Sequence, residues 1–161
     1  MDWGLESWKN LEIMYGRLNY TDKVVLDIGA DWGGTPAFFL SKGARRVIGV
    51  DYHAWYVEKM ADHFRDDCRV FPVQVNVKTS KQMENLIQIY KPDIVKVDCE
   101  GCERLLFDVN NLALCPEYVV EVHSDDVHHS LLSKFKEAGH TVAYQKKLAD
   151  GLYITHWRME E

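Results

Sequence analysis

The chain has 161 residues, of which 47% are hydrophobic and 27% charged, and its formal net charge at pH 7 is -6. These proportions exclude a disordered chain and predict a single domain over residues 1–161. Acidic chains attract polyanions poorly, so the charge argues against a nucleic-acid partner. The start, Met1-Asp2-Trp3-Gly4, has no basic region followed by an apolar run, and no stretch approaches the length of a membrane span. We therefore expect a cytoplasmic protein with no membrane partner.

Residues 1–20 are predicted to form a helical segment, with the helix over Leu5–Tyr20. We expect this segment to pack near a ligand cleft, and its Trp-rich surface is a candidate oligomer interface. Runs rich in Val and Ile follow, as expected for strands buried on both faces of a parallel sheet. The strands are predicted over Val24–Ala30, Arg46–Tyr52, Arg69–Val75, Asp93–Cys99 and Tyr118–His123.

Amphipathic helices are predicted between these strands. Thr79 and Gln82 have the spacing of a capping box, and an apolar stripe follows them. Ser124 is a predicted N-cap, and Gly139 a predicted helix end. A third helix carries the apolar stripe Tyr56, Met60 and Phe64, which we expect to belong to the core.

The predicted sheet closes with an antiparallel pair. The strands Thr141–Lys147 and Leu152–Trp157 flank Asp150-Gly151, a hairpin turn signal. We therefore predict an α/β fold with a mostly parallel seven-stranded sheet, helices on both faces and a C-terminal antiparallel hairpin.

A glycine-rich loop, Asp27–Pro36, follows the first strand and is the expected cofactor site. Thr35 is predicted to cap the next helix, with Pro36 at its first position. A dinucleotide fingerprint would need Gly at position 31, whereas Asp31 there would repel a pyrophosphate. S-adenosylmethionine carries an ammonium, a carboxylate and a sulfonium but no phosphate, and acidic residues in the loop suit it.

Asp51, at the end of the second strand, is expected to accept hydrogen bonds from the ribose hydroxyls. Tyr52 and His53 are expected to border the adenine, and Asn76 to meet its edge. The predicted cofactor-binding set is Asp27, Gly29, Ala30, Asp31, Gly33, Asp51, Tyr52, His53, Asn76 and Asp98.

The fourth strand runs into Lys96-Val97-Asp98-Cys99-Glu100-Gly101-Cys102-Glu103. This segment resembles the K-[IV]-D-x-E-G-x-E motif of the FkbM family of methyltransferases. Asp27-Ile28-Gly29-Ala30 with Gly33 resembles the first motif of that family, and Glu121 with His123 its E-x-H strand ending. The resemblance implies a Rossmann-like class I methyltransferase fold. It also implies S-adenosylmethionine as methyl donor, S-adenosylhomocysteine as product, and a hydroxyl of a small molecule or glycan as acceptor.

The predicted catalytic residues are Glu100, His123 and Asp98, because methyl transfer to a hydroxyl requires removal of a proton. Asp98, Glu100 and His123 can also supply metal ligands, but we predict no metal. Lys96 is expected to be buried and paired with a carboxylate, Glu121 first.

Glu103 is expected to complement a helix N-terminus. Cys99 and Cys102 form a C-x-x-C pair, which can be redox-active or half of a zinc site. Further zinc ligands at metal-site spacing are absent from the sequence, so we predict two small buried residues flanking a tight turn.

Three other functions remain open: a dinucleotide-dependent oxidoreductase, a non-catalytic methyltransferase-like binding subunit, and an RNA or protein methyltransferase. Asp31 and the closing hairpin count against the oxidoreductase. The cofactor motifs count against the binding subunit, and the acidic charge counts against an RNA substrate.

Overall fold

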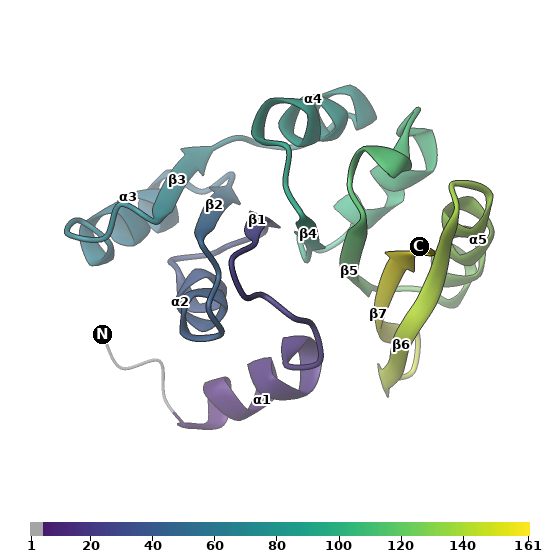
Figure 1. The fold of residues 1–161 in the computed structure, drawn as a ribbon, viewed down its shortest axis with the longest axis horizontal. Helices are drawn as coiled ribbons and strands as arrows, with labels where there is room; N and C mark the ends of the chain where they lie inside the picture. Colours follow the sequence, from purple (N-terminus) through teal and green to yellow (C-terminus); the bar gives the residue numbers. More distant parts are fainter. Residues whose placement is uncertain (1–4) are drawn as a thin grey trace. The chain divides into compact units, whose positions relative to one another are not determined.

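The structure is a computed structural model that describes residues 5–161, so residues 1–4 of the predicted N-terminal segment lie outside the described residues. The chain divides into two compact units, Met1–Asn76 and Val77–Glu161. The strand order is β3-β2-β1 in the first unit and β4-β5-β7-β6 in the second (Figure 1). All seven predicted strands are present, with ends that differ from the prediction by at most two residues. The prediction of one domain stays a prediction.

The first unit alternates helices and parallel strands. Strand β1 pairs in parallel with β2, and β2 pairs in parallel with β3. The elements are α1 (Leu5–Tyr15), β1 (Val24–Ile28), α2 (Gly34–Ser41), β2 (Arg46–Asp51), α3 (Ala54–His63) and β3 (Val70–Gln74).

Strand β2 is buried on both of its faces. Its residues after Arg46 are all buried, and successive side chains of a strand point to opposite faces. Gly49 allows α3 to pack closely, because a Cβ at this position would collide with the sulfur of Met60 and approach the Cβ of Ala30 at 3.4 Å. The prediction that Met60 belongs to the core is confirmed, since its side chain is fully buried.

Helix α1 packs on α2 through aromatic side chains. The ring centroids of Trp8 and Phe38 are 5.3 Å apart, and those of Tyr15 and Phe39 are 5.8 Å apart. The helix ends at Tyr15, five residues earlier than predicted, and Gly16 follows it. Glycine loses more backbone entropy in a helix than any other residue, so it favours this early end.

The start of α2 corrects a prediction. The N-cap is Gly33, with φ 115, and the helix begins at Gly34, so Thr35 is not the cap and Pro36 is not the first helical residue. Only glycine adopts this left-handed conformation without strain, and it brings the chain into the helix earlier. The Thr35 hydroxyl donates instead to the Asp27 carboxylate.

The second unit contains the remaining four strands. Strand β4 pairs in parallel with β5, whereas β7 pairs antiparallel with both β5 and β6. The predicted C-terminal hairpin is therefore confirmed. The elements are α4 (Ser80–Tyr90), β4 (Ile94–Val97), the 3-10 helices η1 (Cys102–Asp108) and η2 (Leu112–Leu114), β5 (Glu117–Val122), α5 (Asp125–Glu137), β6 (His140–Ala149) and β7 (Leu152–Met159).

Side-chain caps begin both α-helices of this unit. The Thr79 hydroxyl accepts from the backbone N–H of Gln82, and the Gln82 side chain accepts from the backbone N–H of Thr79. The Ser124 hydroxyl accepts from the N–H of Val127. Both predicted caps are thus confirmed. Within residues 5–161, no helix has the length and apolar character needed to cross a membrane.

Candidate active site

The loop after β1 is bound to the end of β2 by its backbone. The N–H groups of Gly29 and Ala30 both donate to the carbonyl oxygen of Val50, at 2.9 and 3.1 Å. Gly29 and Gly33 have φ values of 86 and 115, so both positions require the left-handed conformation that glycine favours. The predicted glycine positions therefore shape the loop.

Asp51 connects this loop to the start of α3. Its carboxylate is 6% exposed and accepts from the N–H of Asp31 at 3.0 Å and from the N–H of His53 at 2.9 Å. Each carboxylate oxygen has two lone-pair sites, so each keeps capacity for a further donor such as a ribose hydroxyl. Both the cofactor role and the structural role of Asp51 are compatible with this geometry.

The remaining predicted cofactor residues of the first unit differ in exposure. Asp27 is fully buried and accepts from Thr35. Tyr52 is 63% exposed, and the His53 ring lies 4.8 Å from that of Tyr56. Asn76 is exposed and follows β3. The structure therefore brings Asp27, the glycine loop and Asp51 together, while the roles of Tyr52, His53 and Asn76 stay predictions.

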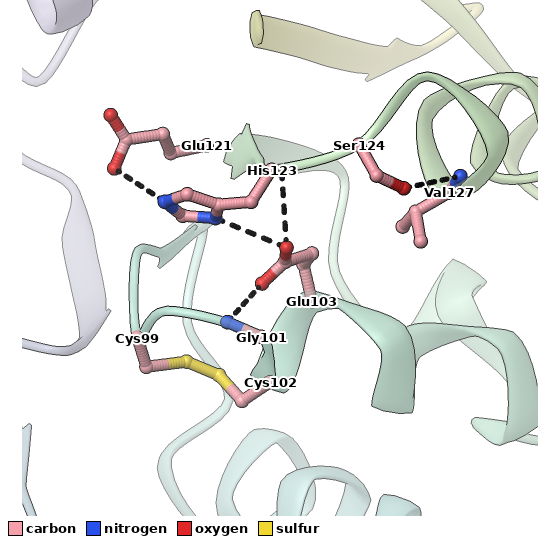
Figure 2. Close-up of polar contacts among 8 residues, drawn as sticks. All are labelled: Cys99, Gly101, Cys102, Glu103, Glu121, His123, Ser124 and Val127. Atoms are coloured by element: carbon pink, nitrogen blue, oxygen red, sulfur yellow. Dashed lines mark hydrogen bonds and ion pairs between the residues drawn. A yellow bond between two sulfur atoms is a disulfide. The ribbon is translucent and has the colours of Figure 1, made fainter. Parts of the chain in front are cut away.

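In the second unit, the turn after β4 is tight. Glu100 and Gly101 have φ values of 49 and 117, and the Cα atoms of Cys99 and Cys102 are 5.5 Å apart. The two cysteines form a disulfide (Figure 2). The prediction of two buried residues flanking a turn is therefore corrected, since both cysteines are half-buried and bonded to each other. The left-handed residues between them bring their Cα atoms into disulfide range.

Glu103 holds His123 in place (Figure 2). Its side chain is 1% exposed, and its Oε1 accepts from the backbone N–H of His123 at 3.2 Å and lies 3.1 Å from Nδ1 of the ring. Its Oε2 accepts from the N–H of Gly101, so the predicted position at a helix N-terminus is confirmed. A carboxylate only accepts, so Nδ1 of the ring donates to Glu103, while Nε2 faces Glu121 at 3.7 Å.

Asp98, Glu121 and Lys96 form a coupled charge cluster. Burial and a hydrogen bond with Asp98 raise the pKa of Glu121 to about 8. Burial also disfavours the ionised form of Asp98, but the Lys96 ammonium, the hydrogen bond with Glu121 and the His123 charge outweigh it and hold the pKa of Asp98 below its usual value. Lys96 is 1% exposed, and its charge acts on both carboxyls, which agrees with the predicted pairing.

The structure brings two of the three predicted catalytic residues together. One ligand atom each of Asp98, Glu121 and His123 lies within 4.8 Å of the others, and Nε2 of His123 is 3.7 Å from Oε2 of Glu121. Glu100 is exposed in the turn and does not belong to this group. Sequence reasoning did not include Glu121 and Glu103 among the site residues. The signal for Glu121 was its spacing of two residues from His123 at the end of β5, which puts both side chains on one face.

Sequence comparison finds a viral relative, while no protein-family model matches the chain. The relative is uncharacterized protein 158B of Sulfolobus islandicus rod-shaped virus 1. It is 31% identical over 117 residues, which are 72% of this chain and 70% of the relative. The FkbM resemblance therefore rests on the quoted motifs alone.

Structure comparison finds a methyltransferase and a protein with bound S-adenosyl-L-methionine. Aeropyrum pernix fibrillarin, in complex with natively bound S-adenosyl-L-methionine, gives a TM-score of 0.69 at 14% identity and covers 94% of this chain and 73% of that one. Precorrin-6y C5,15-methyltransferase of Geobacter metallireducens gives a TM-score of 0.66 at 17% identity, and the match covers 99% of this chain and 90% of that one. These similarities confirm the predicted Rossmann-like class I methyltransferase fold.

Proposed function

This chain belongs to the family of the viral protein 158B, and from this premise we propose that it is an S-adenosylmethionine-dependent methyltransferase. The proposed acceptor is a hydroxyl oxygen of a small molecule or glycan. The observation that carries the proposal is the geometry of Asp51, a buried carboxylate that binds the glycine loop and the start of α3. The fibrillarin structure holds this cofactor in the same fold.

The residues of the first unit fit this cofactor better than a dinucleotide. Asp27 and Asp51 are buried carboxylates, and Asp31 stands in the glycine loop with φ 49. A negatively charged loop opposes the binding of a pyrophosphate and favours a ligand that carries an ammonium and a sulfonium. Under this proposal, Asp51 accepts from the ribose hydroxyls, and the loop backbone lies against the methionine part.

The reaction needs proton removal in addition to cofactor binding. S-adenosylmethionine supplies an electrophilic methyl group, whose bond to sulfur breaks as the bond to the acceptor oxygen forms. The acceptor hydroxyl loses its proton in this step. Asp98, Glu121 and His123 supply the polar groups that receive the acceptor, and Glu103 orients His123. Positioning of the acceptor for in-line attack lowers the barrier further.

Thermal unfolding with S-adenosylmethionine, S-adenosylhomocysteine, NADH or no ligand tests the cofactor assignment. At ~100 times its dissociation constant, a ligand stabilises the folded chain by about 2.7 kcal/mol. We expect an upward shift of the unfolding temperature with the two sulfur compounds and none with NADH. Asp51→Ala is expected to lose the shift, because it removes the acceptor for the ribose hydroxyls.

Asp66→Ala is the matched control, since Asp66 is an exposed carboxylate of the same unit. It should retain the shift of the wild-type chain. A shift with NADH alone would support the oxidoreductase instead. A shift with the sulfur compounds but no turnover on a panel of hydroxyl acceptors would favour the non-catalytic binding subunit.

A further inference from the structure

We propose that Asp98, Glu121 and His123 bind one hard divalent cation, such as Mg²⁺ or Mn²⁺, in the second unit. The binding itself is independent of the proposed methyl transfer, whereas the role of the cation toward an acceptor rests on that proposed function. All three residues belong to the ends of the neighbouring strands β4 and β5 or to the residues that directly follow them.

The spacing of the donor atoms suits a cation. The three ligand atoms lie within 4.8 Å of one another, and Nε2 of His123 is 3.7 Å from Oε2 of Glu121. Ligand-to-metal distances of about 2.0–2.2 Å place two ligands of one ion about 3–4 Å apart. The observed separations are close to this range.

The His123 ring is held as metal-binding histidines usually are. Glu103, which is outside the donor set, contacts Nδ1 with its buried carboxylate and leaves Nε2 facing Glu121 (Figure 2). Carboxylates that bond the second ring nitrogen fix the tautomer and the direction of a ligating histidine. The backbone N–H groups of Gly101 and His123 hold Glu103 in turn, so the ring direction is set before any ligand arrives.

The local charge also favours a cation. Three carboxyl groups, those of Asp98, Glu121 and Glu103, lie around the His123 ring. In their ionised forms they provide negative charge for a divalent cation. Side-chain exposure is 34% for His123 and 13% for Glu121, so water or an acceptor oxygen has access to the open coordination positions.

Such a cation explains how a hydroxyl acceptor is activated. A hydroxyl oxygen that coordinates a divalent cation ionises at lower pH, because the cation stabilises the negative charge. The proton leaves to water on the exposed side, and the oxygen then attacks the methyl carbon. In this arrangement His123 binds the cation, whereas the sequence predicted that it removes the proton as a base.

Electron paramagnetic resonance of Mn²⁺ tests the proposal on the full chain without cofactor. The signal of free Mn²⁺ falls as the ion binds, and we expect one bound ion per chain. Mn²⁺ prefers oxygen and imidazole ligands over thiols, so the cysteines do not compete. Asp98→Asn and His123→Ala are each expected to weaken binding at least ~10-fold.

His129→Ala is the matched control, because His129 is an exposed histidine of α5, outside the donor group. It should bind Mn²⁺ like the wild-type chain, and circular dichroism should show the same fold for all variants. The absence of binding at ~1 mM Mn²⁺, or equal binding by wild type and both ligand variants, would overturn the proposal. Cofactor binding is measured separately without Mn²⁺, so the failure of one proposal is distinguishable from the failure of the other.

Discussion

At the residue scale, the raised pKa of Glu121 makes stability depend on pH. The pKa of Glu121 is raised from its ordinary 4.5 to about 8 by burial and by Asp98. The folded chain therefore keeps this proton up to about pH 8, whereas the unfolded chain releases it near pH 4.5. By linkage, the contribution of Glu121 is fully present below pH 4.5 and is lost as the pH rises to about 8.

We predict that Glu121→Gln removes this loss. Relative to the wild type, the variant should gain free energy of unfolding as the pH rises from 4.5 to 8, as measured by urea denaturation. Burial lowers the pKa of His128 and His140, so these two residues make the chain less stable as the pH falls below 6.5, opposite to the effect of Glu121. The quantity to compare is therefore the difference in free energy of unfolding between variant and wild type. Glu137→Gln, at an exposed position of α5, should show no such trend. A pH-independent difference for Glu121→Gln would contradict this prediction.

At the element scale, α4 begins with a complete capping box. Thr79 and Gln82 satisfy each other's backbone N–H groups, and the N–H of Lys78 also donates to the Gln82 side chain at 2.8 Å. The first N–H groups of a helix have no partner within it, so each side-chain acceptor stabilises the helix end. Ser80 adds a hydrogen bond to the Leu105 carbonyl of η1, which connects two elements of the same unit.

Thr79→Ala is predicted to lower the free energy of unfolding by about 1 kcal/mol, because it leaves the N–H of Gln82 without its acceptor. Chemical denaturation measures the loss. Lys81→Ala, at an exposed position in the same first turn, should stay within about 0.5 kcal/mol of the wild type. Equal losses for the two variants would show that the capping box does not stabilise α4.

At the scale of the whole molecule, the net charge of -6 bears on the acceptor class. Binding to RNA depends on the neutralisation of phosphates by Lys and Arg, and it weakens steeply as salt is added. The chain has 19 Lys and Arg against 25 Asp and Glu, so its overall field opposes an RNA backbone. This balance favours a small-molecule or glycan acceptor over the RNA alternative.

We predict that the chain alone does not bind single-stranded RNA more tightly than ~100 µM at physiological salt, the weak limit of non-specific binding. Fluorescence anisotropy of a labelled RNA at two salt concentrations measures this affinity, with a basic RNA-binding protein as positive control. A micromolar affinity that weakens steeply with salt would favour the RNA methyltransferase.

Local patterns were enough to predict most of the fold. The buried strands, the hairpin at Asp150-Gly151 and the caps at Thr79 and Ser124 each depend on residues close in sequence. The glycine loop and Asp51 were also identified in this way, since the loop and the strand end each have their own motif. The prediction of Thr35 as helix cap was wrong because Gly33, in the left-handed conformation, is the N-cap. The Thr35 hydroxyl donates to the buried Asp27 carboxylate instead.

The sequence by itself determined the order of the elements and the residue types available to the site, because strand burial, helix periodicity and turn chemistry are local properties. Only the tertiary structure decided that Glu103 orients His123, a residue 20 positions away, and that the side chain of Glu121 meets that of Asp98. These contacts depend on the pairing of β4 with β5 and on the turn that follows β4. Register and turn geometry set which side chains meet, and neither can be read from the spacing of residues along the chain.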